Sequence, residues 1–557
     1  MKFSDIPYDR PDMRAYAAAM RAHASRLARA KDVEEAAAAI AGADADVRRF
    51  DTAWSVAAVR QALDTGDDFY REEARFFEKA LPREEKARLA LTRAVLASPL
   101  KGELAERFGD IFIKRLEAEA ASFSEKTEAL IRRENALAAK YCDVLYGARI
   151  ELFGETLSLP QTAPIAEEAD AERRHEAWRA VGSFFDKNGK KFDDIFDKLV
   201  SLRSEEAEKL GFKSYTDLAY LRMERCFGRE EAESFREAAR RELVPLAEAL
   251  YKRKAAEAGL RYPLDFADTL PRDPEGDPLA EPGKMRDAAL TMLRELSPET
   301  AEFADCLLTA GAFDIDAGAK KSGGGFCAQL PEFGTPFVFA DLTGTGADVT
   351  TLTHELGHAF ATWCARDIRP EALRLPTMEA QETCAMAMEL LAMPRAELFF
   401  GADARRYRAT HMESAVCLIP YAAMVDAFQH AVYDSPELTP AQRHEVWRAL
   451  IGEYMPWVRL DGKTPFFGDG KHWQRQSHIY EEPFYYIDYG LAQTAAFGFA
   501  GGGRDALNAY LAFARAGGTE TFSGLLKLAG LPSPFEAETL AAVRRSAEDL
   551  LTQAGRL

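Results

Sequence analysis

Apolar residues recur at intervals of three and four over most of this chain. The pattern runs from Arg10 to about Gly147, continues from Glu172 to about Leu260, and returns between Thr350 and Leu557, in segments rich in Ala, Leu, Arg and Glu. Strong helix formers with this periodicity predict amphipathic α-helices. We therefore expect a mainly α-helical protein, and its 557 residues call for more than one packed subdomain.

Two segments without helical periodicity interrupt the predicted helices. The alternating stretch Ile150–Leu159 predicts a small hairpin that turns at Gly154, and prolines follow it before helices resume. We place a domain boundary here, with an N-terminal helical domain at residues 1–165 and a catalytic domain at residues 166–557. Farther on, residues 261–283 hold five prolines among acidic residues, which predicts a long surface loop.

A third interruption predicts a small β-sheet. Phe326–Leu330 and Pro336–Leu342 are short β-rich runs separated by a turn-like segment, and they follow the glycines that end at Gly325. Those glycines belong to no complete nucleotide-binding pattern. The sheet is thus expected just before the motif that carries chemistry.

Composition excludes several classes of function. Lys and Arg number 71 and Asp and Glu 90, so the formal net charge is −19, which disfavours nucleic acid and anionic lipid as partners. No run of roughly 18 uninterrupted apolar residues predicts a membrane span. The acidic, proline-containing N-terminus does not resemble a signal peptide, and the seven cysteines show no C-x-x-C spacing. We expect a soluble cytoplasmic protein, a monomer or a weak homo-oligomer.

The motif His354-Glu-Leu-Gly-His358 is the strongest chemical signal. On a helix, His354 and His358 lie four residues apart and project from one face, so both can bind one metal ion. Glu355 lies beside them. Apolar neighbours such as Leu352 and Leu356 predict a buried helix, where imidazoles need partners.

A zinc enzyme of this type needs a third protein ligand and an open fourth position. The apolar segment MEAQETCAMAMELLAM contains Glu379, Glu382 and Glu389, and buried carboxylates are costly unless they are paired or bind metal. Glu382 and Glu389 are seven residues apart, on one helical face. One of them as ligand and the other orienting a histidine would satisfy both charges.

These residues together resemble the oligoendopeptidase F and thimet oligopeptidase family of zinc peptidases, closest to its shorter bacterial Pz-peptidase-like branch. Glu382 follows His358 by 24 residues, as the ligand glutamate does in that family, and Glu389 keeps the second glutamate of its motif. Ala385 replaces a serine that the family often has. The resemblance implies one Zn²⁺ per chain, bound by His354, His358 and Glu382, and a helical two-lobed fold with a deep central channel.

The resemblance extends to a late histidine followed by tyrosines. His478 with Tyr485, Tyr486 and Tyr489 is similar to the family's cluster for substrate binding and oxyanion stabilisation. We assign His478, Tyr486 and Tyr489 to catalysis and Tyr485 to substrate binding. On residue type alone, each of these tyrosines fits an aromatic core equally well.

The implied activity is hydrolysis of internal bonds in short unfolded peptides, with zinc-bound water activated by Glu355. The run Pro336–Asp341 is expected to offer an exposed strand edge to an extended peptide through Phe337, Val338 and Phe339, with Gly324 letting main chain approach. An ordinary hairpin with inward aromatics is the simpler alternative for that run.

Two other functions stay open. A carboxydipeptidase of the same family would remove C-terminal dipeptides instead of cutting internally. A catalytically dead peptide-binding scaffold is the alternative from another class, and the joint presence of His354, Glu355, His358 and Glu382 argues against it.

Overall fold

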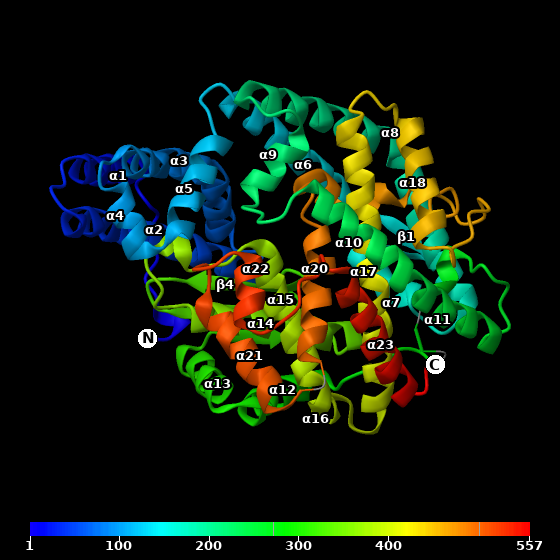
Figure 1. Ribbon diagram of the computed structural model, residues 1–557. Helices are drawn as coiled ribbons and strands as arrows, with labels where there is room; N and C mark the ends of the chain where they lie inside the picture. The colour runs from blue at the N-terminus through cyan, green and yellow to red at the C-terminus, as the bar shows by residue number, and fades with distance from the viewer. Residues whose placement is uncertain (271, 274, 501) are drawn as a thin grey trace. The chain divides into compact units, whose positions relative to one another are not determined.

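The computed structural model describes residues 1–557 except Pro271, Pro274 and Gly501, so two prolines of the predicted loop lie outside the described residues. The chain is mainly α-helical, as expected, with two small sheets (Figure 1). It forms two compact units, each assembled from three separate segments.

The first unit consists of Met1–Ser122, Leu279–Gly401 and Phe499–Leu531. Its strands are β3 (Phe313–Asp316), β4 (Gly324–Leu330) and β5 (Thr335–Leu342). Its helices are α1 (Met13–Ala28), α2 (Val33–Leu63), α3 (Asp68–Ala97), α4 (Lys101–Phe108), α5 (Asp110–Ser122), α12 (Pro282–Leu296), α13 (Pro298–Ala310), α14 (Gly346–Cys364), α15 (Met378–Ala392), α16 (Glu397–Phe400), α21 (Gly503–Ala516) and α22 (Phe522–Leu528).

The second unit consists of Phe123–Pro278, Ala402–Gly498 and Pro532–Leu557. The predicted hairpin is present in it as β1 (Ile150–Leu152) and β2 (Glu155–Leu157). Its helices are α6 (Glu128–Tyr146), α7 (Leu159–Ala166), α8 (Ala171–Leu210), α9 (Tyr215–Arg222), α10 (Arg229–Glu242), α11 (Val244–Glu257), α17 (Ala404–Asp434), α18 (Pro440–Tyr454), α19 (Ser477–Glu481), α20 (Ile487–Ala496) and α23 (Ala537–Gln553).

These units do not coincide with the predicted division between residues 165 and 166. That position lies within Phe123–Pro278, so the hairpin and α6 belong to the same unit as α8. The chain leaves each unit and returns to it. In the first unit, α21 packs on α14 and α15, and α22 packs on α15, although more than a hundred residues separate these helices (Figure 1). Prolines and glycines along the sequence mark local breaks between elements. They do not show that a later segment packs back into an earlier unit.

In the three-stranded sheet, the residues expected to form an exposed edge for the substrate lie on the central strand. Its strand order is β3-β5-β4, with β3 parallel and β4 antiparallel to β5. The run that holds Phe337, Val338 and Phe339 is therefore the central strand, and all three side chains are buried. The prediction that they form an exposed edge was wrong, since β3 covers the second side of β5. The edge strands are β3 and β4, and β4 begins at Gly324.

The expected surface loop contains a buried stretch. The Leu264 N–H donates to the Trp457 carbonyl, and Phe266–Asp268 forms a short, buried 3-10 helix.

In the part of the chain that the structure describes, one helical stretch, Glu397–Asp434, is long and apolar enough to cross a membrane. However, 72% of its most apolar window is buried. It is explained as core, since α17 packs against α10, α18 and α20.

Candidate metal centre

The His-Glu-Leu-Gly-His motif lies where α14 and α15 cross at close range. A Cβ atom on Gly357, the glycine of His-Glu-Leu-Gly-His, would lie 2.6 Å from Ala385 Cα and 2.7 Å from the Cys384 carbonyl oxygen. Only glycine fits at that spacing, and small Ala385 completes the contact. The glycine thus lets the glutamates of α15 reach the histidines of α14.

The start of α14 is held by a dense set of hydrogen bonds. Asp348 accepts from the backbone N–H groups of Thr343, Gly344 and Thr345, and Thr345 Oγ1 accepts from the Asp348 N–H in a capping box. Such caps satisfy the otherwise unpaired N–H groups of the first turn. On the inner face, Leu352, Leu356 and Phe360 are fully buried, which sets the rotation of the helix.

Three side chains converge in the predicted way. His354 Nε2 lies 3.2 Å from Glu382 Oε2, and His358 Nε2 lies 3.7 Å from the same oxygen. One donor atom from each residue lies within 4.8 Å of the others. Donors around a tetrahedral zinc ion, each at about 2.0 to 2.1 Å from it, are separated by roughly 3.3 Å. Two imidazoles and one carboxylate at these distances fit a zinc ion and leave a fourth position.

Glu389 contacts His354 at Nδ1, the ring nitrogen that does not face Glu382. Its Oε1 lies 2.8 Å from His354 Nδ1, which leaves Nε2 directed toward Glu382. Although burial alone would lower the pKa of His354, hydrogen bonds to Glu382 and Glu389 raise it well above the usual range. His358 lacks a comparable partner, and burial lowers its pKa to about 4. An imidazole that stays neutral at pH 7 is ready to bind metal.

Glu355 lies between the histidines and strand β4. Burial raises the pKa of its carboxyl to about 7, while the backbone N–H of Cys327 on β4 donates to it and opposes that rise. A carboxylate with a pKa near neutrality is suited to accept and return a proton. Because Glu355 follows His354 directly on α14, it lies next to the candidate metal ligands.

The backbone of β4 presents hydrogen-bonding groups on the side away from β5. Val338, opposite Cys327, donates its N–H to the Ala312 carbonyl beside β3. The Cys327–Val338 pair is therefore not hydrogen-bonded across the strands, and the N–H and C=O of Cys327 point outward. By alternation, those of Gly325 and Gln329 point outward as well. No strand among the described residues pairs with this second edge of β4.

The late histidine and the tyrosines form one cluster in the second unit. The ring centre of His478 lies 5.6 Å from that of Tyr485, 5.0 Å from Tyr486 and 5.7 Å from Tyr489. Tyr489 Oη is 3.4 Å from His478 Nε2. The structure thus brings together all four residues that the sequence singled out here.

Two residues that the sequence analysis missed orient this histidine. Tyr421 donates to Gln476 Oε1 at 3.1 Å, and the Gln476 amide nitrogen lies 2.8 Å from His478 Nδ1. Since the amide nitrogen can only donate, Nδ1 of neutral His478 accepts and Nε2 carries the proton. Gln476 stands two residues before His478, but a single glutamine carries no spacing signal that would have marked it.

Two segments of the chain match models of known protein families. Residues 3–123 match the Peptidase M3 N-terminal domain and residues 300–545 match Peptidase family M3. A solved structure of Pz peptidase A with an inhibitor is 34% identical, with 99% of each chain covered and a TM-score of 0.93. The chain belongs to peptidase family M3. This membership confirms the resemblance read from the motifs and supports a peptidase.

Two further relatives are also similar to this chain. A putative oligoendopeptidase F from Bacillus anthracis is 31% identical, covers 99% of this chain and 98% of its own, and has a TM-score of 0.89. The oligopeptidase PepF of Bacillus subtilis is 26% identical over 267 residues, a match that spans 44% of this chain and only 38% of that relative. The small side chain of Ala385 suits the contact with Gly357.

Proposed function

We propose that this M3 family member is a zinc-dependent oligoendopeptidase that cuts internal bonds of short, unfolded peptides. The observation that carries the proposal is the convergence of His354, His358 and Glu382 at metal-binding distance, with Glu355 beside them. A cytoplasmic location and a monomeric or weakly associated state belong to the same proposal.

One Zn²⁺ ion would be held by His354, His358 and Glu382. When bound, zinc acts as a Lewis acid that polarises a peptide carbonyl and lowers the pKa of water. Glu389 would keep Nε2 of His354 aimed at the ion by occupying Nδ1. Such partners raise the basicity of the ligand and fix its orientation.

Glu355 is proposed as the general base. Its carboxylate would take a proton from the attacking water and pass it to the nitrogen of the leaving amine. The Cys327 N–H fixes one side of this carboxylate and so limits its rotation. No covalent bond between enzyme and substrate is needed in this scheme, because water is the nucleophile.

Strand β4 is proposed to hold the substrate main chain. The outward groups of Gly325 and Gln329, together with the carbonyl of Cys327, can pair with an extended peptide as a further strand, while the Cys327 N–H stays with Glu355. A Cβ on Gly325 would lie 3.0 Å from Thr351 Cγ2 of α14, so this glycine lets the strand lie close to the catalytic helix. Pairing through main chain favours unfolded peptides with varied side chains. The family resemblance assigns oxyanion stabilisation to His478, Tyr486 and Tyr489.

The test combines metal analysis with product analysis. Glu382→Ala should lose most of its zinc, whereas Glu355→Gln should keep zinc and fold but lose nearly all hydrolysis. Mass spectrometry of a mixed peptide library should show internal cuts in short peptides, while folded proteins survive. Full zinc in Glu382→Ala would point to another ligand, and products that are always C-terminal dipeptides would favour a carboxydipeptidase.

A further inference from the structure

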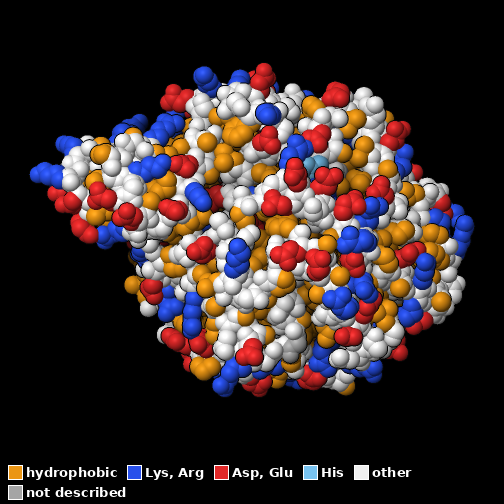
Figure 2. All heavy atoms as spheres, viewed as in Figure 1, with side chains coloured by type: hydrophobic (Ala, Val, Ile, Leu, Met, Phe, Trp, Pro, Cys, Tyr) orange, Lys and Arg blue, Asp and Glu red, His pale blue; other side chains and the backbone are white. Residues whose placement is uncertain are grey.

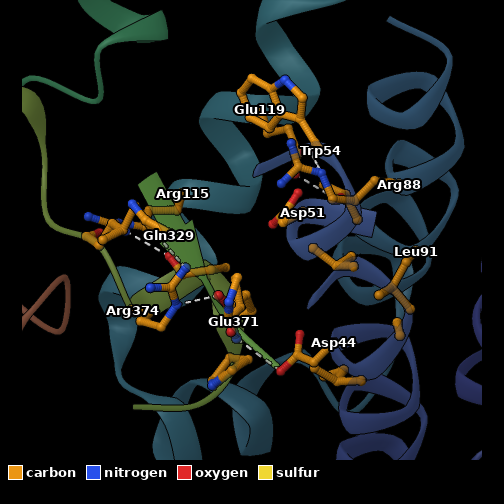
Figure 3. A pocket seen from close by; sticks show the side chains of 18 of the residues that line it. Asp44, Asp51, Trp54, Arg88, Leu91, Arg115, Glu119, Gln329, Glu371 and Arg374 are labelled. Carbon is orange, nitrogen blue, oxygen red and sulfur yellow. Dashed lines mark hydrogen bonds and ion pairs between the residues drawn. The ribbon is translucent and has the colours of Figure 1, made fainter. Parts of the chain in front are cut away.

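A mostly apolar cavity that also holds charged side chains lies in the first unit, beside strand β4, whose Cys327 N–H reaches Glu355. Its volume is about 520 Å³, within the roughly 300 to 1,000 Å³ typical of ligand pockets. Its walls are one face each of α2, α3 and α5, the segment Phe326–Gln329 of β4, and the loop around the 3-10 helix Glu371–Leu373 (Figure 3). The cavity therefore shares β4 with the candidate active site.

The arginines of the cavity are already engaged by the protein. Arg88 pairs with Glu119 at 3.3 Å and with Glu84 at 3.8 Å. Arg115 donates to two main-chain carbonyl oxygens at 2.7 Å, and Arg374 binds Glu371 and Gln329. An anion entering the cavity would have to displace these partners.

The carboxylates are less well matched. Four acidic residues line the cavity against three arginines, namely Asp44, Asp51, Glu119 and Glu371. Within the part of the chain that the structure describes, the Asp51 carboxylate forms no hydrogen bond or ion pair, and Arg88 and Arg374 act on it only at longer range. Figure 3 shows this carboxylate on α2, next to Arg88 in that view, with no dashed line to any of the side chains drawn.

Burial raises the pKa of two carboxyl groups on α2, those of Asp51 and Asp44. It raises the pKa of Asp51 to about 7, with the charge of Glu84 adding to the effect, and it raises the pKa of Asp44 to about 6. Asp44 accepts one hydrogen bond, at 2.9 Å from the Glu371 N–H. A cation placed between these side chains would supply the charge that they lack.

Trp54 adds a second feature suited to a cation. It follows Asp51 by three residues on α2, so both lie on the face that lines the cavity, and its side chain is 42% exposed. The face of an indole attracts ammonium and guanidinium groups. Carboxylate and indole together form a site for the positively charged end of a flexible group.

We infer that this cavity is a substrate subsite that takes a cationic group of the peptide, with Asp51 as its counter-charge and Trp54 as its aromatic wall. The inference rests on the proposed peptidase function. Cys327, whose N–H reaches Glu355, and Gln329, which lines the cavity, are about 6.6 Å apart along β4. The cationic group therefore belongs to a residue within about three positions of the cleaved bond. It is either a Lys or Arg side chain or the α-ammonium group of the peptide.

Binding should be measured in Glu355→Gln, so that hydrolysis does not consume the ligand. The probes are fluorescent peptides of about ten residues with one Arg at successive positions, each matched to a peptide with neutral citrulline there. Arg should bind roughly 10- to 100-fold more tightly at one position. An acetylated and a free N-terminus, compared in the same way, distinguish the α-ammonium source from the side-chain source.

Variants tie the preference to the cavity. Asp51→Asn should abolish it, and Trp54→Leu, at an exposed position, should weaken it roughly two- to fivefold. Glu302→Gln removes the same charge from exposed α13 outside the cavity and should leave it unchanged. Equal binding of all matched peptides, a preference that survives Asp51→Asn, or tighter binding of a free C-terminal carboxylate than of its amide would each overturn the inference.

The two proposals fail in different ways. If peptides with Arg bind preferentially in an Asp51-dependent manner but are never hydrolysed by the wild-type protein, only the proposed peptidase function is wrong. If peptides are hydrolysed at similar kcat/KM with Arg and with citrulline at every position, the subsite is wrong and the peptidase function stands.

Discussion

His354 Nδ1 and Glu389 Oε1 lie 2.8 Å apart, while Nε2 of the same ring faces Glu382. The two nitrogens of one imidazole are thus assigned to two glutamates of one helix, seven residues apart on α15. The structure separates the roles that the spacing alone left open: Glu382 lies near both histidines, and Glu389 reaches only the rear of His354.

Glu389→Gln should therefore weaken zinc binding without removing a ligand. The amide keeps the size of the side chain but not its charge, so His354 becomes less basic and less firmly oriented. We expect an affinity loss of roughly 10- to 100-fold, measured by competition with a chelator of known strength. Glu302→Gln serves as the matched control. Unchanged affinity would mean that Glu389 does not support the ligand.

The contact between Gly357 and Ala385 makes a prediction about stability. Glycine to alanine inside a helix ordinarily stabilises by about 0.5 to 1 kcal/mol. Gly357→Ala should instead lower the melting temperature and the zinc content, because its Cβ would lie 2.6 Å from Ala385 Cα and push α15 away. Gly452→Ala on α18, where the new Cβ meets nothing within 4 Å, is the matched control and should be neutral or slightly stabilising. Equal behaviour of the two variants would contradict a close helix crossing.

The His478 cluster predicts a particular kinetic signature. If His478 and a tyrosine donate only to the developing oxyanion, His478→Ala and one of the three phenylalanine variants, at Tyr485, Tyr486 or Tyr489, should lower kcat about 10²- to 10³-fold at nearly constant KM. A higher KM with kcat preserved in all four would assign the cluster to substrate binding. Loss of melting temperature alone would make it an aromatic core.

The sequence placed the candidate metal ligands together because the information for this arrangement is local. His354, Glu355 and His358 fall within five residues on α14, and Glu382 and Glu389 within eight on α15, so helical periodicity places them on shared faces. The crossing of the two helices could be expected only through the family resemblance. Gly357 provides the physical reason for the close crossing, since a Cβ at this position would clash with α15.

The sheet and the cavity were missed because they depend on distant partners. Strand β3 is four residues long with an aspartate at every second position, so no run of apolar residues marks it, and its pairing with β5 spans more than twenty residues. That pairing makes β5 the central strand and leaves β4 as the strand proposed to bind the substrate main chain. The cavity residues Asp51, Arg88 and Arg374 come from three segments, and each is typical of a solvated helix face or loop when seen alone.

The last prediction concerns the stability cost of Asp51. Its pKa is raised from about 3.9 in unfolded chains to about 7, mainly by burial and next by Glu84, while Arg88 and Arg374 oppose the rise and Glu371 adds to it. Between these values the folded state binds more protons than the unfolded state. Stability is therefore lost as pH rises from about 4 to 7, and the loss is complete above 7.

Asp51→Asn removes the titrating group and should raise the melting temperature by roughly 1 to 3 °C at pH 8. At pH 4.5 the gain should nearly vanish, because the wild-type carboxyl is then protonated in the fold. Thermal melts of wild type, Asp51→Asn and Glu302→Gln at both pH values measure this, and only Asp51→Asn should show a pH-dependent difference. A variant that gains stability while losing its preference for cationic peptides would show that the uncompensated charge is kept for binding. If Asp51→Asn were instead less stable at pH 8, Arg88 or Arg374 would already balance the carboxylate, and the cavity would have no need of a cation from the substrate.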